Sequence, residues 1–307
     1  MKTVEEAFTA WSKSGLDSLV NGCSWQVYLS KVVGLDDPGS PATLAGTAYH
    51  AALELHERAR ILNLRGADVQ VPDQSTLMDV IYDVVEEGAP AIPDEQWHLH
   101  GSEPALVADK ATVALNHWWH TPYDDDGESL RDRLMGMRPV LAEPYFRLDA
   151  GSSPRPLHGY IDWVGYNHDD GVWVIVDHKS AGSYGRWPRD GAGHEVEAAT
   201  YTVGALRAAG IPVSGPVRME WHVTRTAEGQ NSRFEGARLV TRTVDRYDEM
   251  LLGDTVQIAD RIVDEGRFET NTSWNLCSQK WCPFWRGCQV TGELSPEQLH
   301  SQYAVST

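Results

Sequence analysis

Leu157-His-Gly-Tyr-Ile-Asp162-Trp-Val-Gly-Tyr166 and Val172-Trp-Val-Ile-Val-Asp177-His-Lys179 are two apolar runs joined by the polar segment Asn167-His-Asp-Asp-Gly171. Asp-Gly between two β-branched runs is typical of a β-hairpin. Side chains alternate between the faces of a strand, so we expect Asp177 and Lys179 to point one way and His178 the other. If Asp162 lies on the same face of the partner strand, two carboxylates and one ammonium group converge at one end of the sheet.

Two carboxylates beside a lysine suit metal-assisted cleavage of a phosphodiester. The acids can hold a hard cation, and the lysine can orient water or neutralise charge. The alternative is that these side chains are merely solvated, because acids and lysines are common at strand ends. The motif alone does not separate the two interpretations, and the rest of the chain has to decide.

Composition sets broad limits. A chain of 307 residues with 41% apolar content can bury one large core or two modest ones. No apolar run is long enough to span a bilayer, and the N-terminus, Met1-Lys-Thr-Val-Glu-Glu, lacks an apolar signal core. We therefore expect a soluble, intracellular protein with no membrane partner.

The formal charge of −18 argues at first against a nucleic-acid partner, because basic side chains dominate phosphate binding. The acidic charge is concentrated, however. Between Asp68 and Glu128 there are 14 acidic residues and one basic residue, whereas Arg207 to Arg246 contains seven arginines and four acids. Screening confines such fields to about 8 Å at physiological salt. DNA therefore remains a possible partner.

Hydrophobic periodicity predicts the elements. Helices are expected within 6–33, with an interruption near Ser14-Gly15, and over about 43–64, 74–90, 103–120, 194–209 and 245–268. Strands are expected from Arg138 through the hairpin, and again at 217–224 and 237–244. This order predicts a single α/β domain over 1–307. Its parts are a helical N-terminal segment (1–35), an acidic helical insertion or cap (66–137), the α/β core (138–268) and a C-terminal cysteine segment (269–307).

The cysteines form one isolated residue, Cys23, and a C-terminal group of Cys277, Cys282 and Cys288. In an intracellular protein such a group more often holds a metal than disulfides. Four thiolates suit either zinc or an iron–sulfur cluster. Zinc ligands usually come in two closely spaced pairs, so the one-plus-three arrangement favours iron–sulfur. Four unrelated buried thiols remain the alternative. A shared site would staple the two ends of the chain together.

Other candidate residues lie on helices and one loop. His50 is in a predicted helix four residues after Gly46, which would allow another element to approach closely; a lone histidine is more often structural, but imidazole is a common metal ligand. Glu197 and Tyr201 share one helix face at a spacing of four. The glycine-rich loop 182–193, which follows Lys179, contains Arg186 and Arg189.

Together these pieces resemble the RecB-like branch of the PD-(D/E)XK nucleases, in particular the iron–sulfur exonucleases associated with CRISPR systems and found in many phages. The resemblance runs nearly end to end. It rests on Ser12-Lys-Ser-Gly-Leu16 with Cys23, Gly46-Thr-Ala-Tyr-His50, Gly159-Tyr-Ile-Asp162, Asp177-His-Lys179, Glu197-Ala-Ala-Thr-Tyr201, and the three C-terminal cysteines.

The resemblance implies a restriction-endonuclease-like core, in which a central mixed β-sheet is flanked by helices, with a helical insertion. It also implies a 4Fe–4S cluster, with zinc less favoured, that joins the N- and C-terminal segments through the four cysteines. Catalytic Mg²⁺ or Mn²⁺ would be bound by His50, Asp162, Asp177 and the carbonyl of His178, while Lys179 would assist the attacking water. Residues expected along the DNA path are Tyr201, Glu197, Arg186 and Arg189.

The resemblance adds one further candidate residue and leaves two departures from the family's pattern. Glu143 is expected to support the metal ligands from behind. Glu197 stands where glutamine is usual, which puts an acid near DNA phosphate. The spacing from Cys277 to Cys282 is wider than the two intervening residues that are commonest in the family.

The expected function is metal-dependent exonuclease action on DNA that is single-stranded or has free ends, in phage recombination, repair or CRISPR-type processing. Recombination or CRISPR adaptation proteins are possible partners, and the location would be cytoplasmic, in the host cell if the protein is phage-encoded. Because an imidazole accompanies the carboxylates, activity is expected with magnesium and often more with manganese. The alternative is a DNA-end-binding or partner-docking subunit with a nuclease fold. A zinc-stapled protein with no role on nucleic acid ranks third.

Overall fold

The computed structural model describes residues 1–37, 39–208, 210, 216–227, 236–274, 276–288, 291–292, 295 and 298. They group into two compact units. Unit 1 combines Met1–Gly39, Arg147–Gly159 and Glu249–Thr307, and unit 2 combines Ser40–Phe146 and Tyr160–Asp248. Among the described helices, none combines the length and apolar character needed to cross a membrane.

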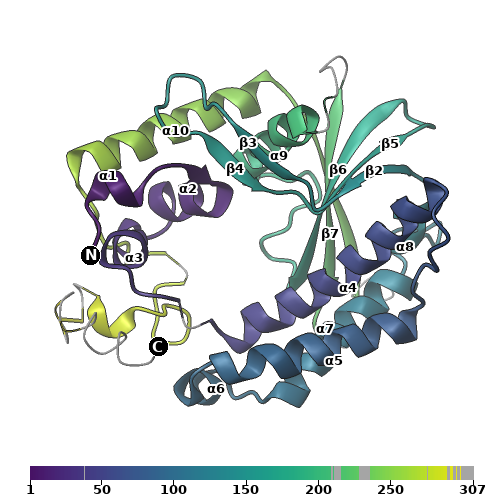
Figure 1. Ribbon diagram of the computed structural model, residues 1–307, viewed down its shortest axis with the longest axis horizontal. Helices are drawn as coiled ribbons and strands as arrows, with labels where there is room; N and C mark the ends of the chain where they lie inside the picture. The colour runs from purple at the N-terminus through teal and green to yellow at the C-terminus, as the bar shows by residue number, and fades with distance from the viewer. Residues whose placement is uncertain are drawn as a thin grey trace. The chain divides into compact units, whose positions relative to one another are not determined.

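Unit 2 is built on a mixed five-stranded sheet, as the resemblance implied (Figure 1). The predicted hairpin is confirmed: β5 and β6 are antiparallel, and the Gly171 N–H donates to the Asn167 carbonyl at 2.9 Å. Gly171 has a φ of +69°, which a residue without Cβ adopts easily. Among the described strands of this five-stranded sheet, β6 and β7 pair in parallel and the other neighbours pair antiparallel. The order is β2 (Arg138–Ala142), β5 (Trp163–Asn167), β6 (Val172–Ala181), β7 (Val217–Arg225) and β8 (Ala237–Val244).

Helices cover both faces of this sheet. Val174 and Val176 on β6 pack into one core with apolar residues of α4, α5 and α7, which lie together on one side of the sheet (Figure 1). α9 packs on the opposite face, where its Glu197 lies 3.6 Å from Lys179 on β6. α4 begins cleanly because Ser40 caps it and Pro41 occupies its first position. The helices are α4 (Pro41–Leu64), α5 (Gln74–Gly88), α6 (Asp94–His100), α7 (Pro104–His120), α8 (Leu130–Met135) and α9 (Glu195–Ala208), with a 3₁₀ turn at Ala89–Ala91.

The acidic segment contributes to this core as an amphipathic layer. On α5, Leu77 and Ile81 are fully buried, whereas Asp79 and Asp83 on the same helix are exposed. The negative charge of the segment therefore belongs to a solvated helix face, and the apolar face binds the helix to the rest of unit 2.

Two chain segments bend side by side at the edge of the sheet. The continuous strand predicted for 157–166 is wrong: it is broken at Ile161 and Asp162, because β4 (Leu157–Tyr160) belongs to a separate three-stranded sheet ordered β1-β4-β3. The partner segment bends between β2 and β3 (Tyr145–Leu148) at Glu143. The Glu143 N–H donates to the Asp162 carbonyl at 3.0 Å, and the Ile161 N–H to the Pro144 carbonyl at 3.3 Å.

Unit 1 joins the two ends of the chain. Ser24 exchanges two hydrogen bonds with the main chain of Glu269, at 3.0 and 2.7 Å, and the Asn271 side chain donates to the Gly22 carbonyl at 3.0 Å. The elements are α1 (Val4–Ala7), β1 (Trp11–Ser12), α2 (Lys13–Val20), α3 (Ser24–Tyr28), a π turn at Leu29–Val33, most of α10 (Arg246–Glu265) and a 3₁₀ turn at Trp285–Gly287.

The predicted helix over 6–33 is more interrupted than expected. The break near Ser14-Gly15 lies earlier, because Ser12 caps a helix that begins at Lys13. A second break, at Asn21–Cys23, was missed. Gly22 is packed so tightly there that a Cβ would come within 2.8 Å of the Ser18 carbonyl oxygen.

Candidate active site

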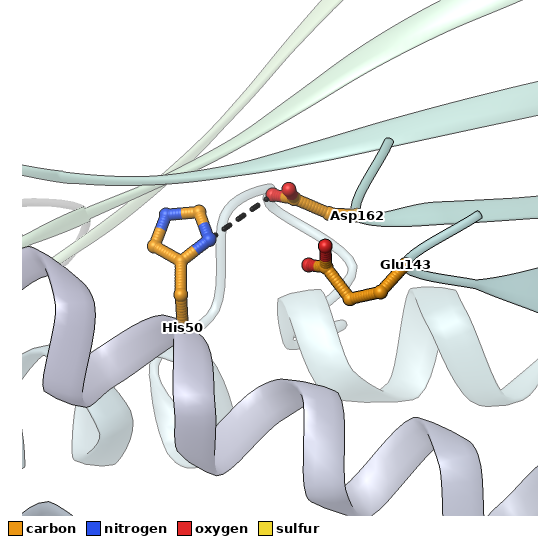
Figure 2. A group of neighbouring side chains, drawn as sticks. All are labelled: His50, Glu143 and Asp162. Carbon is orange, nitrogen blue, oxygen red and sulfur yellow. Dashed lines mark ion pairs between the residues drawn. The ribbon is translucent and has the colours of Figure 1, made fainter. Parts of the chain in front are cut away.

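Three ligand-type side chains meet at the bent edge of the sheet. His50 comes from α4, while Glu143 and Asp162 come from the two adjacent bends (Figure 2). The His50 Nδ1 lies 3.3 Å from an Asp162 carboxylate oxygen. One ligand atom from each of the three residues lies within 4.8 Å of the other two. One imidazole nitrogen and two carboxylates are a donor set that can hold a divalent cation.

Glu143 takes a more direct place than the sequence predicted. Its carboxylate is a member of this group, and does not lie behind it. Its backbone has a φ of +50°, in the left-handed region that a residue with a side chain adopts at a cost; among the described non-glycine residues it is the sole case. Burial and the charges of Asp162 and Glu54 raise the pKa of Glu143 to about 7. Glu143-Pro144, which interrupts an alternating strand pattern, was the available signal.

Asp162 is the best-stabilised anion of the group. Its buried setting raises the pKa of Asp162, but the charge and hydrogen bond of His50 outweigh burial and bring it to about 2. The main-chain N–H of His178 also donates to its carboxylate at 2.6 Å. Burial lowers the pKa of His50, but the charge of Asp162 and its hydrogen bond raise it further than burial lowers it. Asp162 is therefore ionised at neutral pH.

Asp177 and Lys179 lie on one face of β6, as alternation predicted. The Lys179 Nζ is 2.5 Å from the Asp177 carboxylate and 3.6 Å from that of Glu197. Burial raises the pKa of Asp177, Lys179 lowers it, and Asp162 and Glu197 raise it, with a net value of about 7. Burial lowers the pKa of Lys179, but Asp177 and Glu197 raise it well above its usual range. Lys179 is thus a permanent cation between two acids.

His178 points to the opposite face, also as predicted. Its ring lies 6.2 Å from that of Trp118 and 5.4 Å from that of His222, between centroids. Burial and the neighbouring His222 hold the pKa of His178 well below its usual range, so the imidazole is neutral. The part of His178 that reaches the site is its main chain, through the bond to Asp162.

The glutamate in the glutamine position is buried beside Lys179. Glu197 on α9 is 3% exposed, and its second oxygen lies 3.2 Å from the His194 Nδ1. The other ring nitrogen of His194 lies 2.8 Å from the Arg186 carbonyl oxygen. Glu197 therefore connects the lysine to the 182–193 loop. Tyr201, on the same helix, is half-buried, and burial followed by the charge of Asp177 raises its pKa.

Basic side chains gather around Tyr184 in that loop. Arg186 and Arg189 are both exposed. Burial raises the pKa of Tyr184 to about 12, against the opposing charges of Arg238, Arg225 and Arg189. The Arg238 guanidinium lies 4.2 Å from the centre of the Tyr184 ring. Three arginine charges therefore act on Tyr184, in a chain whose formal charge is −18.

One buried contact that sequence reasoning missed fixes the spacing of His50 and Asp162. Glu57 lies seven residues after His50 on α4 and is 2% exposed. Its carboxylate accepts a hydrogen bond from the Trp163 indole at 2.9 Å and one from Arg60 at 3.1 Å. Because Trp163 follows Asp162 directly, this bond ties the helix of one candidate ligand to the strand of the other. In the sequence, the sign of this contact is that Glu57 and Arg60 stand one turn apart on the apolar face of a helix, where charged residues are buried only when they are paired.

The four cysteines, all within the described residues, carry free thiols in unit 1. Burial raises the pKa of Cys282 to about 11, and the nearby sulfurs of Cys23, Cys288 and Cys277 add to the rise. The four sulfurs are thus neighbours. Among these described thiols, no three have sulfurs within 4.8 Å of one another.

The comparisons with known proteins agree with this geometry. The family model described as the PD-(D/E)XK nuclease superfamily matches residues 10–289. A search of curated proteins gave no match. The family match covers both ligand-bearing bends, the Asp177–Lys179 strand and all four cysteines. Nucleases of this kind use divalent metals, and DNA is the substrate that the fold indicates. The chain belongs to the PD-(D/E)XK nuclease superfamily.

Proposed function

We propose that this protein is a divalent-metal-dependent DNA exonuclease of the RecB-like, iron–sulfur branch of its superfamily. The observation that carries the proposal is the meeting of His50, Glu143 and Asp162 beside the Asp177–Lys179 pair. With Glu197 included, four carboxylates lie beside one lysine and two histidines, His50 and His194. Such an excess of negative charge suits a cation of charge two.

The residues divide the work by their charge. His50, Glu143 and Asp162 would hold the metal, with Asp177 and the His178 carbonyl as further ligands. A bound ion supplies Lewis-acid polarisation of the phosphate and a water of lowered pKa. The His178 N–H holds the Asp162 carboxylate in orientation. Lys179, held cationic by Asp177 and Glu197, neutralises charge that develops on the phosphate and orients water.

Magnesium and manganese should both support cleavage, with manganese often better. Magnesium prefers oxygen ligands, whereas manganese accepts an imidazole nitrogen more readily. Because the donor set contains one nitrogen beside several carboxylate oxygens, it favours manganese over magnesium.

The DNA path would run from this site toward Tyr184 and the arginines of the 182–193 loop and of strands β7 and β8. Arg186, Arg189, Arg225 and Arg238 offer the positive charge that phosphate binding requires. Tyr201 would line the path, close to Asp177 and Lys179. Glu197, which is buried against Lys179 and His194, would act by positioning that lysine, with no contact to phosphate.

The cysteine group would hold a structural 4Fe–4S cluster. Four neighbouring thiols drawn from both chain ends fit this group. A single zinc ion with bonds of about 2.3 Å gathers its thiolates tightly. A cluster in which each thiolate binds a different iron holds the thiolates further apart. A brown protein with visible absorption supports the cluster, and a colourless protein that carries zinc contradicts it.

The activity is tested with linear DNA labelled at either end, in Mn²⁺ or Mg²⁺, with circular DNA alongside. We expect loss of nucleotides from ends over time, and no loss in Asp177→Ala or Lys179→Ala that remain folded. Asp169→Ala, an exposed acid in the turn of the same hairpin, is the matched control. If wild type and Asp177→Ala behave alike, the nuclease proposal fails. If wild type binds ends without cutting them, the protein is the docking subunit.

The same time course gives polarity and strand preference. Action from free ends would suit phage recombination, repair or CRISPR-type processing, in the cytoplasm of the cell or of a phage host. Partners in those processes are recombination or adaptation proteins. Degradation of circular DNA as fast as linear DNA would replace the exonuclease assignment with an endonuclease.

A further inference from the structure

Two exposed tyrosines form a pair on the segments that leave the candidate active site. Tyr145 at the start of β3 is 47% exposed, and Tyr160 at the end of β4 is 62% exposed. Their ring centroids lie 5.2 Å apart, with the planes inclined at 56°. Both residues belong to unit 2. The pair is therefore a broad aromatic surface open to solvent.

Backbone pairing fixes the position of this surface relative to the acids. Glu143 bonds to Asp162, and Ile161 to Pro144, across the two segments. The next opposed residues in the same register are Tyr145 and Tyr160. Each tyrosine is two residues from an acid of the metal group, and two extended residues span about 7 Å. That is the scale of one nucleotide.

The charges near Tyr145 and Tyr160 indicate which kind of chemical group could bind against their rings. Glu143 and Asp162 repel a phosphate that approaches without a metal, and no such repulsion acts on a neutral base. A cross-strand aromatic pair stabilises two strands by contact between the rings, which needs no open ring area. Here about half of each ring's residue remains exposed, which leaves surface for a flat, uncharged partner.

We propose that Tyr145 and Tyr160 form a stacking site for an unpaired nucleobase of the strand being cut. The proposal rests on the nuclease function proposed above and deepens it, because it assigns a single-stranded or frayed end as the substrate. Inside a duplex both faces of a base are covered by its neighbours, so a base at an internal position can stack on protein rings only when it is splayed out. The rings hold a base while its phosphate lies at the acids and Lys179.

The test is a double-mutant cycle between protein rings and DNA bases. Wild type, Tyr145→Ala and Tyr160→Ala are titrated by fluorescence anisotropy, in Ca²⁺ to restrain cutting. The ligands are a single-stranded oligonucleotide and copies with one abasic nucleotide at each successive position from the end. Tyr145→Phe and Tyr160→Phe keep the rings. Tyr247→Ala, a tyrosine that is 60% exposed and distant in sequence from the acids, is the matched control. Circular dichroism checks folding.

We expect each alanine variant to bind the intact strand about 5- to 100-fold more weakly, the range typical of one stacked base. One abasic position should weaken wild type by a similar factor and have little further effect on Tyr160→Ala. The phenylalanine variants and Tyr247→Ala should bind like wild type. Equal abasic effects in wild type and both alanine variants at every position would overturn the stacking site.

The failure of stacking is separable from the failure of the function. Wild type that cuts DNA in Mn²⁺ but shows no coupling in the cycle retains the proposed function and loses the stacking site. Wild type that binds with coupling but does not cut loses the nuclease function and keeps the base-binding surface. Wild type that neither binds nor cuts overturns both.

Discussion

Glu220 and Asp177 are buried acids on adjacent strands of one sheet, and the protein treats them in opposite ways. Glu220 on β7 contacts Arg133 and Arg218, each at 2.8 Å, and His222 at 3.3 Å. Burial raises the pKa of Glu220, but His222 and Arg133 lower it to about 2. Asp177 on β6 shares one lysine with Glu197, and its pKa is raised to about 7.

The two networks differ in whether the protein's own cations balance the buried carboxylates. Around Glu220, two arginines neutralise one carboxylate within the protein. Around Asp177 and the group of His50, Glu143 and Asp162, the carboxylates outnumber the cations, and ionising all of them costs folding free energy. Such a cost is typical of sites where function outweighs stability. The following predictions, from the largest expected effect to the smallest, test whether the two regions differ in this sense.

Asp162→Asn should have the largest effect and act on activity. It removes the charge that touches both His50 and the main chain of His178, so we expect about a 1,000-fold or greater loss of Mn²⁺-dependent cleavage. Initial rates on end-labelled DNA measure it, with Asp169→Asn as the exposed-acid control. A loss below tenfold would remove Asp162 from the metal group.

Glu220→Gln should act on stability instead. It leaves Arg133 and Arg218 without a buried counter-charge, and breaking such a network costs about 3–5 kcal/mol. Urea unfolding measures the loss, with Glu86→Gln on the exposed face of α5 as the control. Cleavage by the folded fraction should stay close to wild type. An unchanged unfolding midpoint would show that the two regions do not differ as proposed.

Trp163→Phe should lower both the stability of the fold and the affinity for Mn²⁺. It removes the indole hydrogen bond to Glu57 and leaves that buried carboxylate with one partner fewer, at a cost of about 1–3 kcal/mol. Because the bond sets the spacing of α4 and β5, Mn²⁺ affinity should fall about tenfold. Calorimetric titration measures affinity, and Trp173→Phe on β6 is the control. Lost stability with unchanged affinity would limit the bond to folding.

Asp177→Asn should stabilise the metal-free protein. The pKa of Asp177 is raised above its unfolded value, so its contribution is favourable below about pH 4 and is lost as pH rises through about 7. Replacing it should therefore add about 1–2 kcal/mol near pH 8 and less near pH 5. Unfolding in chelator at both pH values measures this.

Glu220 provides the opposite sign for the same experiment. Its pKa is lowered, so its contribution is present above about pH 4.5 and is lost as pH falls toward 2. In Glu220→Gln, the free energy of unfolding should therefore change less between pH 4.5 and pH 2 than it does in wild type. In Asp177→Asn, the difference from wild type should instead appear at neutral and alkaline pH. Two variants with the same pH profile would contradict the contrast.

Local patterns predicted the parts of the site that share one strand or one helix. Alternation gave the common face of Asp177 and Lys179 and the opposite direction of His178, and Asp-Gly gave the hairpin turn. The mixed sheet flanked by helices followed from the order of elements and the family resemblance, which the match over 10–289 supports at the level of the superfamily.

The remaining features depend on contacts between distant segments. The bend at Asp162 arises because β4 and β5 belong to different sheets, and apolar patterning is the same on both sides of it. The place of Glu143 follows from that bend and from a left-handed backbone that its residue type does not indicate. Glu57 and Trp163 are 106 positions apart, so their bond cannot be read from spacing.

The hydrogen bonds between Ser24 and Glu269 have a consequence for the order of events on the ribosome. Unit 2 occupies an inner stretch of chain, and all its strands and both ligand-bearing bends are made before residue 249. Domains generally fold as units while synthesis proceeds. Cys23, which emerges among the first residues, must wait for Glu269 and the three late cysteines before its own surroundings exist. The nuclease core is therefore complete in sequence while the cysteine unit is still half-synthesised, so the neighbourhood of the four thiols forms only after the core can fold.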